Sequence, residues 1–240
     1  MKEIQQILSC VRHSVEKYEM IRDGDKIAVG VSAGKDSLTL LCALAELKRF
    51  LPAQFELHAI TIDMGFPDTD FSQVQALCNK LNVPYHIIKT EISKVIFDIR
   101  KEKNPCSLCA RMRRGALHDA TVEIGCNKIA LGHHYDDVIE TFMLNLFFEG
   151  RIGTFNPVTY LSRKGITMIR PLISTPEKEI KRLTRVLTLP IIKSPCPANG
   201  NTERENMKQY LRVFDQKHRN LYKRIMTAIE KAKIDGYKER

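Results

Sequence analysis

Short apolar runs alternate with longer amphipathic stretches along this chain. The apolar runs have the length and content of buried strands, and they cover residues 27–31, 55–62, 84–89, 128–131 and 167–170. The amphipathic stretches repeat apolar residues at helical spacing, over residues 4–20, 38–48, 71–81, 105–125, 136–148 and 176–187. This alternation predicts an α/β fold with a doubly wound, parallel, five-stranded sheet and with N-terminal and C-terminal helices, the last a long helix or helix pair over 203–233.

The first predicted strand leads directly into the turn Ser32–Ser37, which reads Ser-Ala-Gly-Lys-Asp-Ser, and then into a helix. The first amides of a helix lack partners inside the helix and carry the positive end of its dipole, so they suit a phosphate. Gly34 allows close approach of the backbone, and Lys35 adds a cation. The turn therefore predicts a nucleotide site, with an ordinary polar turn as the alternative.

Two common nucleotide-binding motifs are excluded at this turn. A Walker A loop needs glycine and a hydroxyl residue where Val29 and Asp36 stand. The dinucleotide motif Gly-x-Gly-x-x-Gly does not occur in the sequence. The turn must therefore belong to another class of phosphate-binding loop.

Two further predicted strands end in polar residues that suit the same ligand. Asp63 closes the second strand beside Gly65, and the fourth strand closes on Gly132-His-His-Tyr-Asp-Asp137 before a helix starts. Asp136 or Asp137 can hold Mg²⁺, which takes one or two protein carboxylates together with phosphate oxygens. Because aspartate also favours turns and helix starts, a purely structural role is the alternative.

The formal net charge of +10 is concentrated in two segments. Residues 100–115 hold six Lys or Arg against one Glu, and residues 203–240 hold eleven Lys or Arg against six Asp or Glu. Basic side chains gain affinity by displacing counterions from phosphates, so a polyanion larger than a mononucleotide is the expected partner. Solvated helix faces are the alternative interpretation.

The composition is that of a soluble globular protein, with 43% hydrophobic and 28% charged residues. No apolar run approaches about 20 residues, and the N-terminus lacks the features of a signal peptide, so we expect a cytoplasmic protein without a membrane anchor. In that compartment the seven cysteines are expected to be thiols or metal ligands rather than disulfides.

Three cysteines stand out from the others by their sequence context. Cys106 and Cys109 form a Cys-x-x-Cys pair in a basic stretch whose arginines favour the thiolate form, and Cys196 lies between two prolines. Three ligands suit a [4Fe–4S] cluster with one open iron, whereas the pair alone suits zinc or a redox dithiol equally well. The remaining cysteines lie singly in apolar or periodic segments and are expected in the core, at Cys10, Cys42, Cys78 and Cys126.

The turn Ser32–Ser37 resembles the PP-loop of the ATP-pyrophosphatases, usually Ser-Gly-Gly-Lys-Asp-Ser, with Ala33 in place of a glycine. Residues 132–137 resemble the second signature of that family. Together with similar motifs at 106–115, 145–151, 169–172 and 195–196, they make most of the chain similar to the TtcA family, the tRNA 2-thiocytidine synthetases. One departure is Asn199, where better-known members carry a second downstream cysteine. The alanine is a mild departure unless its position needs a positive φ, and we expect it to leave ATP binding intact.

This resemblance implies a PP-loop ATP-binding catalytic domain over 23–190, between an N-terminal helix over 1–22 and a Cys loop with a basic helical tail over 191–240. The implied cofactors are ATP, Mg²⁺ and a [4Fe–4S] cluster. Expected nucleotide contacts are Ser32, Ala33, Gly34, Lys35, Asp36, Ser37, Ile62, Asp63, Met64, Gly132, His133 and Asp137. The residues expected to act in catalysis are Lys35, Asp36, Asp137, Cys106, Cys109 and Cys196, with the three cysteines as cluster ligands and Asp137 as the Mg²⁺ ligand. His134 is expected only to pack.

The implied reaction is ATP-dependent thiolation of tRNA, in which ATP adenylates the C2 oxygen of a cytidine and sulfur then replaces it. Its partners are tRNA, a sulfur donor (a cysteine desulfurase or free sulfide), and a second copy of the chain in a homodimer. Candidate tRNA contacts are Arg111, Arg113, Arg114 and Arg151. Three alternatives stay open from the sequence: a PP-loop ligase similar to lysidine synthetase, a LarE-type sulfur transferase, and a zinc-stapled RNA-binding protein.

Overall fold

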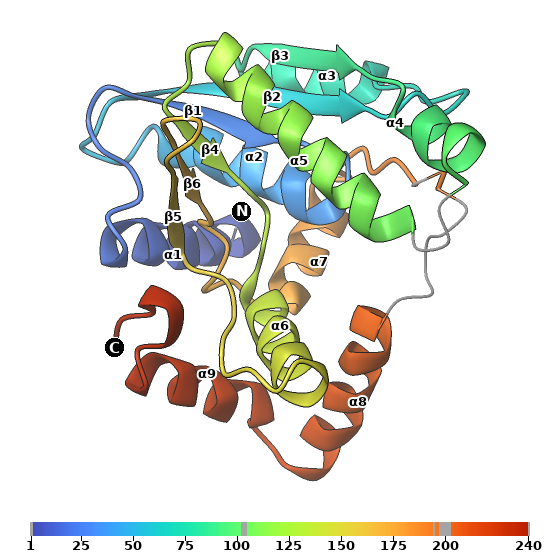
Figure 1. The fold of residues 1–240 in the computed structure, drawn as a ribbon. Helices are drawn as coiled ribbons and strands as arrows, with labels where there is room; N and C mark the ends of the chain where they lie inside the picture. Colours follow the sequence, from blue (N-terminus) through green and yellow to red (C-terminus); the bar gives the residue numbers. More distant parts are fainter. Residues whose placement is uncertain (1, 102–104, 194, 197–202, 240) are drawn as a thin grey trace.

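The computed structural model describes residues 2–101, 105–193, 195–196 and 203–239. At its centre is a six-stranded sheet in the order β3-β2-β1-β4-β6-β5 (Figure 1). The strands are β1 (Asp25–Gly30), β2 (Phe55–Asp63), β3 (Tyr85–Lys89), β4 (Lys128–Ala130), β5 (Val158–Leu161) and β6 (Ile166–Ile169). Every pair of neighbours is parallel except β5 and β6, which form an antiparallel hairpin at one edge.

The strand order reverses at β1, which pairs with β2 on one side and with β4 on the other. The chain first builds outward through β2 and β3, and then returns to the other side of β1 to build β4 and β6. In such a sheet the connections leave in opposite directions at the reversal, so a crevice opens outside the carboxyl ends of β1 and β4. Both polar motifs predicted from the sequence follow these two strands.

Helices cover both faces of the sheet. On one face α1 (Lys2–Lys17), α2 (Lys35–Leu47), α3 (Ser72–Lys80) and α7 (Glu177–Val186) contribute apolar side chains to the main core. On the other face α5 (Pro105–Glu123) covers a smaller cluster that includes Ala28, Ile60 and Ala120. Between β3 and α5 the chain forms α4 (Ile92–Lys94) and the π-helical turn η1 (Val95–Ile99).

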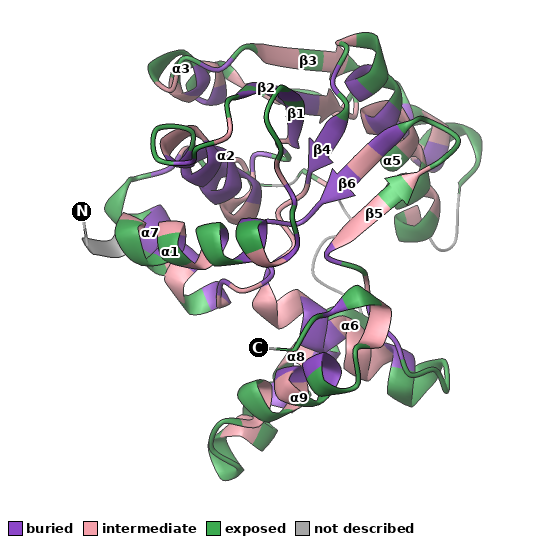
Figure 2. Ribbon diagram, turned by 90° about the vertical axis from the view of Figure 1, so that its left-hand side faces the viewer, coloured by how far each residue is buried: buried purple, intermediate pink, exposed green. Residues whose placement is uncertain are grey.

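A helical lobe extends from the carboxyl side of the sheet (Figures 1 and 2). It consists of α6 (Tyr135–Phe148), α8 (Glu203–Lys217), α9 (Leu221–Lys231) and the short 3₁₀ helix η2 (Ile234–Gly236). Buried residues of α8 and α9, among them Met207 and Ile229, belong to the same main core as α1 and α2. The basic tail predicted from the sequence is therefore packed onto the rest of the chain.

The predicted α/β fold and doubly wound parallel sheet are confirmed, and the C-terminal region is a helix pair broken at Asn220, which has φ 66°. The sheet has one strand more than predicted, the antiparallel β5. Of the cysteines expected in the core, Cys42, Cys78 and Cys126 are buried, whereas Cys10 is only partly buried. No helix in the described ranges combines the length and the apolar character needed to cross a bilayer.

Candidate active site

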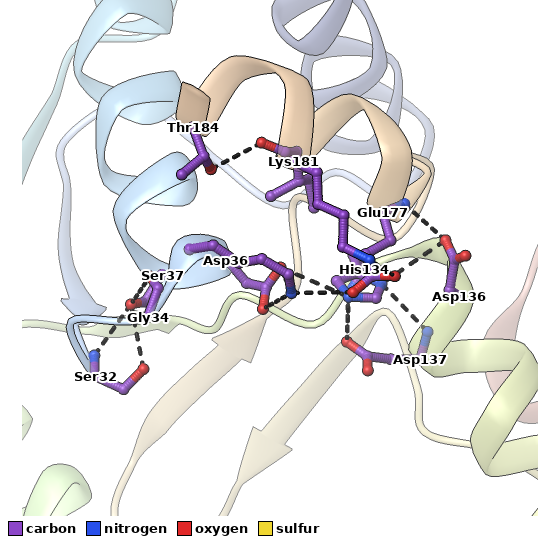
Figure 3. Close-up of polar contacts among 12 residues, drawn as sticks. Ser32, Gly34, Asp36, Ser37, His134, Asp136, Asp137, Glu177, Lys181 and Thr184 are labelled. Atoms are coloured by element: carbon purple, nitrogen blue, oxygen red, sulfur yellow. Dashed lines mark hydrogen bonds and ion pairs between the residues drawn. The ribbon is translucent and has the colours of Figure 1, made fainter. Parts of the chain in front are cut away.

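The turn between β1 and α2 is held by its own serines. The Ser37 hydroxyl accepts a hydrogen bond from the Ser32 amide at 3.2 Å and donates one to the Gly34 carbonyl at 3.0 Å. The two serine hydroxyls lie 3.2 Å apart, and Gly34 caps α2 with an extended backbone (Figure 3). The first amides of α2 are thus presented at the carboxyl end of β1, in the arrangement that binds phosphate.

Ala33 adopts φ 57°, in the left-handed region that L-residues with a Cβ atom resist. The position at which the sequence departs from the usual glycine is therefore one where glycine has an advantage, so the departure is less mild than expected. The Ala33 side chain is 1% exposed, and its carbonyl accepts a hydrogen bond from the Ile192 amide at 3.0 Å. This main-chain bond connects the turn to the segment that leads to Cys196.

A cleft of about 690 Å³ lies outside the carboxyl ends of the strands, a volume in the range of small-molecule sites. Its walls include most of the predicted nucleotide contacts: Ser32, Ala33, Gly34, Asp36, Ser37, Ile62, Asp63, Met64, Gly132, His133 and Asp137. Lys35 is the one predicted contact that does not line it. Segments far apart in the sequence therefore share one cleft, as the strand order requires.

The second signature packs directly against the first. A Cβ atom on Gly132 would lie 3.0 Å from the Asp36 carbonyl carbon and 3.1 Å from the Ser37 amide nitrogen, so the close approach requires glycine. His134 is 3% exposed and caps α6 through a reciprocal pair of bonds: the Asp137 amide donates to its Nδ1 at 3.3 Å, and its own amide donates to Asp137 Oδ2 at 2.9 Å. His134 therefore does more than the packing predicted for it, because it caps α6 and its Nε2 lies 3.6 Å from the Asp36 carboxylate.

His133 faces the cleft and stacks against Phe155, with the ring centres 4.9 Å apart. Burial, together with the charge of Arg170, lowers the pKa of His133 to about 4. Its Nδ1 is buried without a hydrogen-bond partner in the described part of the chain. A neutral imidazole therefore stands in the cleft wall, and its unpartnered Nδ1 is closed off from the cleft by burial.

Asp137 and Asp136 differ in what their carboxylates contact. Asp136 accepts a hydrogen bond from the Glu177 amide at 2.7 Å, whereas Asp137 lines the cleft and lies 3.5 Å from Arg204. Within the described ranges no three His, Cys, Asp or Glu side chains converge to enclose a metal ion. Because Mg²⁺ needs only one or two protein carboxylates beside phosphate oxygens, Asp137 still fits the predicted role, and Asp136 is committed to the start of α7.

Lys35 points away from the cleft toward a cluster of charges. Its ammonium lies 2.8 Å from Asp36 and 3.2 Å from Glu177. Burial alone would lower the pKa of Lys35, but these two carboxylates outweigh burial and raise it. Lys35 is therefore held as a cation beside the phosphate-binding turn.

The three predicted cluster ligands lie near one another at the mouth of the cleft. Cys106 and Cys109 occupy the first turn of α5, and Ala110 and Pro195, the neighbours of Cys109 and Cys196, line the cleft. Burial raises the pKa of Cys109, and Cys196 and Cys106 are close enough to raise it further, while Arg113 lowers it. Arg113 thus favours the thiolate form of Cys109, as predicted, but burial outweighs it and the pKa is raised overall.

In the part of the chain that the structure describes, no fourth ligand accompanies the three thiols, and three thiols fit the donor set of a [4Fe–4S] cluster better than that of a structural zinc ion. Asn199, which replaces the second downstream cysteine, lies outside the described residues.

The predicted tRNA contacts are divided between two places. Arg113 and Arg114 line the cleft, and Arg111 is exposed on the same helix. Arg151 lies beyond the far end of α6, where it pairs with Glu149 at 3.6 Å, and it does not line the cleft. The structure thus brings the arginines of α5 to the cleft but not Arg151.

Sequence reasoning missed the buried carboxylate of Glu177, which contacts Lys35, Lys181 and Lys208. In the sequence it is only an acidic residue after Pro176 at a helix start, and two of its partners, Lys35 and Lys208, lie far away along the chain. The aromatic residues Phe66 and Phe71, which line the cleft, were missed as well. No local pattern distinguishes them from residues of an ordinary loop.

Comparisons with known proteins agree with this geometry. The PP-loop domain family matches residues 4–213. A tRNA-cytidine(32) 2-sulfurtransferase of Pelobacter propionicus is 39% identical over 226 residues, which cover 91% of this chain and 84% of that protein. The enzyme of the same name from Geobacter sulfurreducens is 36% identical over 228 residues, covering 94% and 89%. The chain belongs to the PP-loop family, among the tRNA-cytidine 2-sulfurtransferases.

A solved structure extends the likeness of this PP-loop protein to a second thiolase. The U34-tRNA thiolase NcsA from Methanococcus maripaludis, determined with its [4Fe–4S] cluster, is similar with a TM-score of 0.75 and 26% identity. The match covers 93% of this chain and 77% of that one. The family resemblance drawn from the sequence motifs is confirmed.

Proposed function

We propose that this protein is an ATP-dependent tRNA sulfurtransferase that replaces the C2 oxygen of a cytidine with sulfur and releases AMP and pyrophosphate. The observation that carries the proposal is the shared cleft. Residues of the phosphate-binding turn, of the second signature and of the thiol-bearing α5 all line it. Activation of a base and its attack by sulfur need both sets of groups at one carbon atom, and a shared cleft satisfies that need.

In this function ATP binds with its phosphates at the first amides of α2, next to the hydroxyls of Ser32 and Ser37. The backbone of Ile62 to Met64 borders the base, and the neutral imidazole of His133 forms part of the same cleft wall. Asp137 would hold Mg²⁺, which would offset the negative charge of the phosphates. The cytidine oxygen attacks the α-phosphate, the bond to the β-phosphate breaks, and Lys35 stabilises charge on the departing pyrophosphate.

The thiols serve the second half of the reaction. Cys106, Cys109 and Cys196 would hold a [4Fe–4S] cluster, which would supply Lewis-acid chemistry for handling the sulfur. Sulfur then bonds to C2 of the adenylated base, the C2–O bond breaks, and the oxygen leaves on AMP. Arg113 and Arg114 hold the tRNA backbone at the cleft, so that an unstacked base can enter. The transferred sulfur is at the oxidation level of sulfide, so it comes from free sulfide, or from the persulfide of a cysteine desulfurase after a two-electron reductant such as a thiol pair has released it as sulfide.

The test is anaerobic reconstitution with iron and sulfide, followed by incubation with ATP and bulk tRNA and by nucleoside mass analysis. We expect one sulfur in place of oxygen on cytidine, together with AMP and pyrophosphate. Sulfur on uridine instead would assign the chain the specificity of the U34 thiolase to which its structure is similar. Modification without tRNA would favour the LarE-type alternative.

Cysteine variants separate the remaining alternatives. Cys106→Ala, Cys109→Ala and Cys196→Ala are each expected to lose the broad iron–sulfur absorbance near about 400 nm and the thiolation, while retaining ATP binding. Cys126→Ala is the matched control, because that thiol is buried under α5 and away from the cleft. Full activity of the three variants would point to a ligase that attaches an amine, and stoichiometric zinc would point to a zinc-stapled RNA-binding protein.

A further inference from the structure

The carboxylate of Glu177 is buried among cations next to the phosphate-binding turn. Its side chain is 7% exposed, and it lies 3.2 Å from Lys35, 2.9 Å from Lys181 and 2.8 Å from Lys208. Burial alone would raise the pKa of Glu177, but the bonds from Lys208 and Lys181 and the charge of Lys35 hold it well below its usual range. The group is therefore a permanent anion, since a buried charge persists where it is paired on several sides.

Glu177 connects four helices, through its carboxylate and through its amide, and Figure 3 shows the amide contact with Asp136. It sits in the first turn of α7, contacts Lys35 at the start of α2, and contacts Lys208 of α8. The Glu177 amide donates to Asp136 in the first turn of α6 at 2.7 Å. The start of α7 thus connects the turn, the second signature and the C-terminal helix pair.

The contacts also decide where Lys35 points. Its ammonium lies between the carboxylates of Asp36 and Glu177, and Lys35 is the residue of the turn that does not line the cleft. A lysine so placed is close to the phosphates but is not free to follow them. Its long stem would otherwise let the cation reach any nearby anion.

We propose that Glu177 is a positioning residue, which holds the Lys35 ammonium back from bound ATP and keeps it where the pyrophosphate develops charge, with Lys208 fixing Glu177 to α8. The inference rests on the proposed function for the role of Lys35 on pyrophosphate. It predicts two effects of opposite sign. Loss of the Glu177 charge frees Lys35 for the ground-state phosphates, so ATP binds more tightly, but the cation is no longer preorganised and turnover falls.

The first measurement is a titration of ATP binding to the apo protein without tRNA, by calorimetry. Glu177→Gln is expected to bind ATP about threefold more tightly, the size of one partly buried ion pair. The ATP-dependent release of pyrophosphate with tRNA is expected to fall about tenfold in kcat, with a lower KM for ATP. Glu177→Asp, which keeps the charge, is expected to recover part of the turnover. Weaker ATP binding in Glu177→Gln with no recovery in Glu177→Asp would overturn the proposal.

A matched pair of lysine variants tests the link to α8. Lys208 and Lys181 contact the same carboxylate at nearly equal distances, but Lys181 belongs to the same helix as Glu177. Lys208→Met is expected to lower kcat about threefold, whereas Lys181→Met leaves it unchanged because that pair is more exposed and worth little. Equal effects of the two substitutions would mean that charge alone matters and would refute the link.

Two further readouts keep the outcomes separate. Thermal melting of each variant identifies a loss of folding, and the Lys208→Met measurement then tests the link through a variant that keeps the buried carboxylate. The ATP titration does not depend on thiolation. If the wild-type protein fails to thiolate tRNA but Glu177→Gln still binds ATP more tightly, the role of Glu177 in restraining Lys35 is supported and the proposed reaction is refuted. If the wild-type protein thiolates tRNA but Glu177→Gln binds ATP as the wild type does, the proposed reaction is supported and the role of Glu177 is refuted.

Discussion

The alanine in the phosphate-binding turn gives the sharpest test of the structure. Ala33→Gly removes a methyl group from a residue with φ 57° that is 1% exposed. Relief of the left-handed conformation stabilises the folded protein by about 1 kcal/mol. The added freedom of glycine in the unfolded chain costs about 0.4–1 kcal/mol, and the lost burial of one methyl group costs about 0.8 kcal/mol.

These contributions offset one another to within about 1 kcal/mol, so the melting temperature is expected to move by less than about 3 °C. ATP affinity, measured by calorimetry on the apo protein, is expected to change by less than tenfold, which is about 1.4 kcal/mol, because the turn already has the conformation that glycine would adopt. Binding more than tenfold tighter in Ala33→Gly would refute this reasoning, since the alanine would then be distorting the site.

A second substitution at the same position supplies the contrast. Ala33→Val puts a β-branched side chain at a positive φ in a buried place, where the conformation and the packing are both unfavourable. We expect a loss of about 2–3 kcal/mol, a lower melting temperature and weaker ATP binding. An Ala33→Val variant as stable as the wild type would show that the left-handed conformation at this position is not required.

Three other substitutions test the site at separate points. Gly132→Ala places a Cβ atom 3.0 Å from the Asp36 backbone, so it should destabilise the fold by about 1–3 kcal/mol and weaken ATP binding. The control is Gly115→Ala, whose Cβ atom would have no atom within 4 Å, and it should be neutral or stabilising in thermal melts. Burial and Asp137 raise the pKa of Glu140 from 4.5 to about 7. Between pH 4.5 and about pH 7 the folded protein therefore keeps a proton on Glu140 that the unfolded chain has lost, and the free energy of unfolding falls as pH rises through this range. Glu140→Gln should therefore stabilise more at about pH 8 than at about pH 5, by at most about 3 kcal/mol in urea unfolding, and an equal gain at both would contradict the shift. Arg114→Ala should reduce the salt dependence of tRNA binding by about one unit of slope and weaken binding more than Arg151→Ala, since Arg114 alone of the two lines the cleft.

Local patterns in the sequence were enough to predict the elements that hold the nucleotide. The strand β1, the turn and α2 are consecutive, so their apolar run, small residues and helical spacing specify them together. The edge strand β5 was not predicted, because its four residues are partly exposed, with Tyr160 66% exposed, and it is held by its hairpin with β6. An edge strand of this kind carries little of the periodicity that marks a buried one.

The side-chain network of the site was predicted less well than its backbone. Glu177 and Lys181 are four residues apart on one helix, a spacing that the sequence shows, but no spacing rule connects Glu177 with Lys35 and Lys208. Asp136 and Asp137 look equivalent in the sequence, and only the packing of α7 against α6 assigns one to the Glu177 amide and leaves the other at the cleft. The balance between burial and Arg113 at Cys109 likewise depends on depth, which the sequence does not contain.

The hydrogen bond from the Ile192 amide to the Ala33 carbonyl connects the phosphate-binding turn to the segment that carries Cys196. Cys196 follows four residues later, so an extended chain places its Cα atom at most about 14 Å from that bond. A main-chain contact of this kind does not depend on the identity of either side chain, and Ile192→Pro is the substitution that removes its donor. The length of the chain between residues 192 and 196 therefore limits the distance between Cys196 and the phosphate-binding turn, whether or not a cofactor or a substrate is bound.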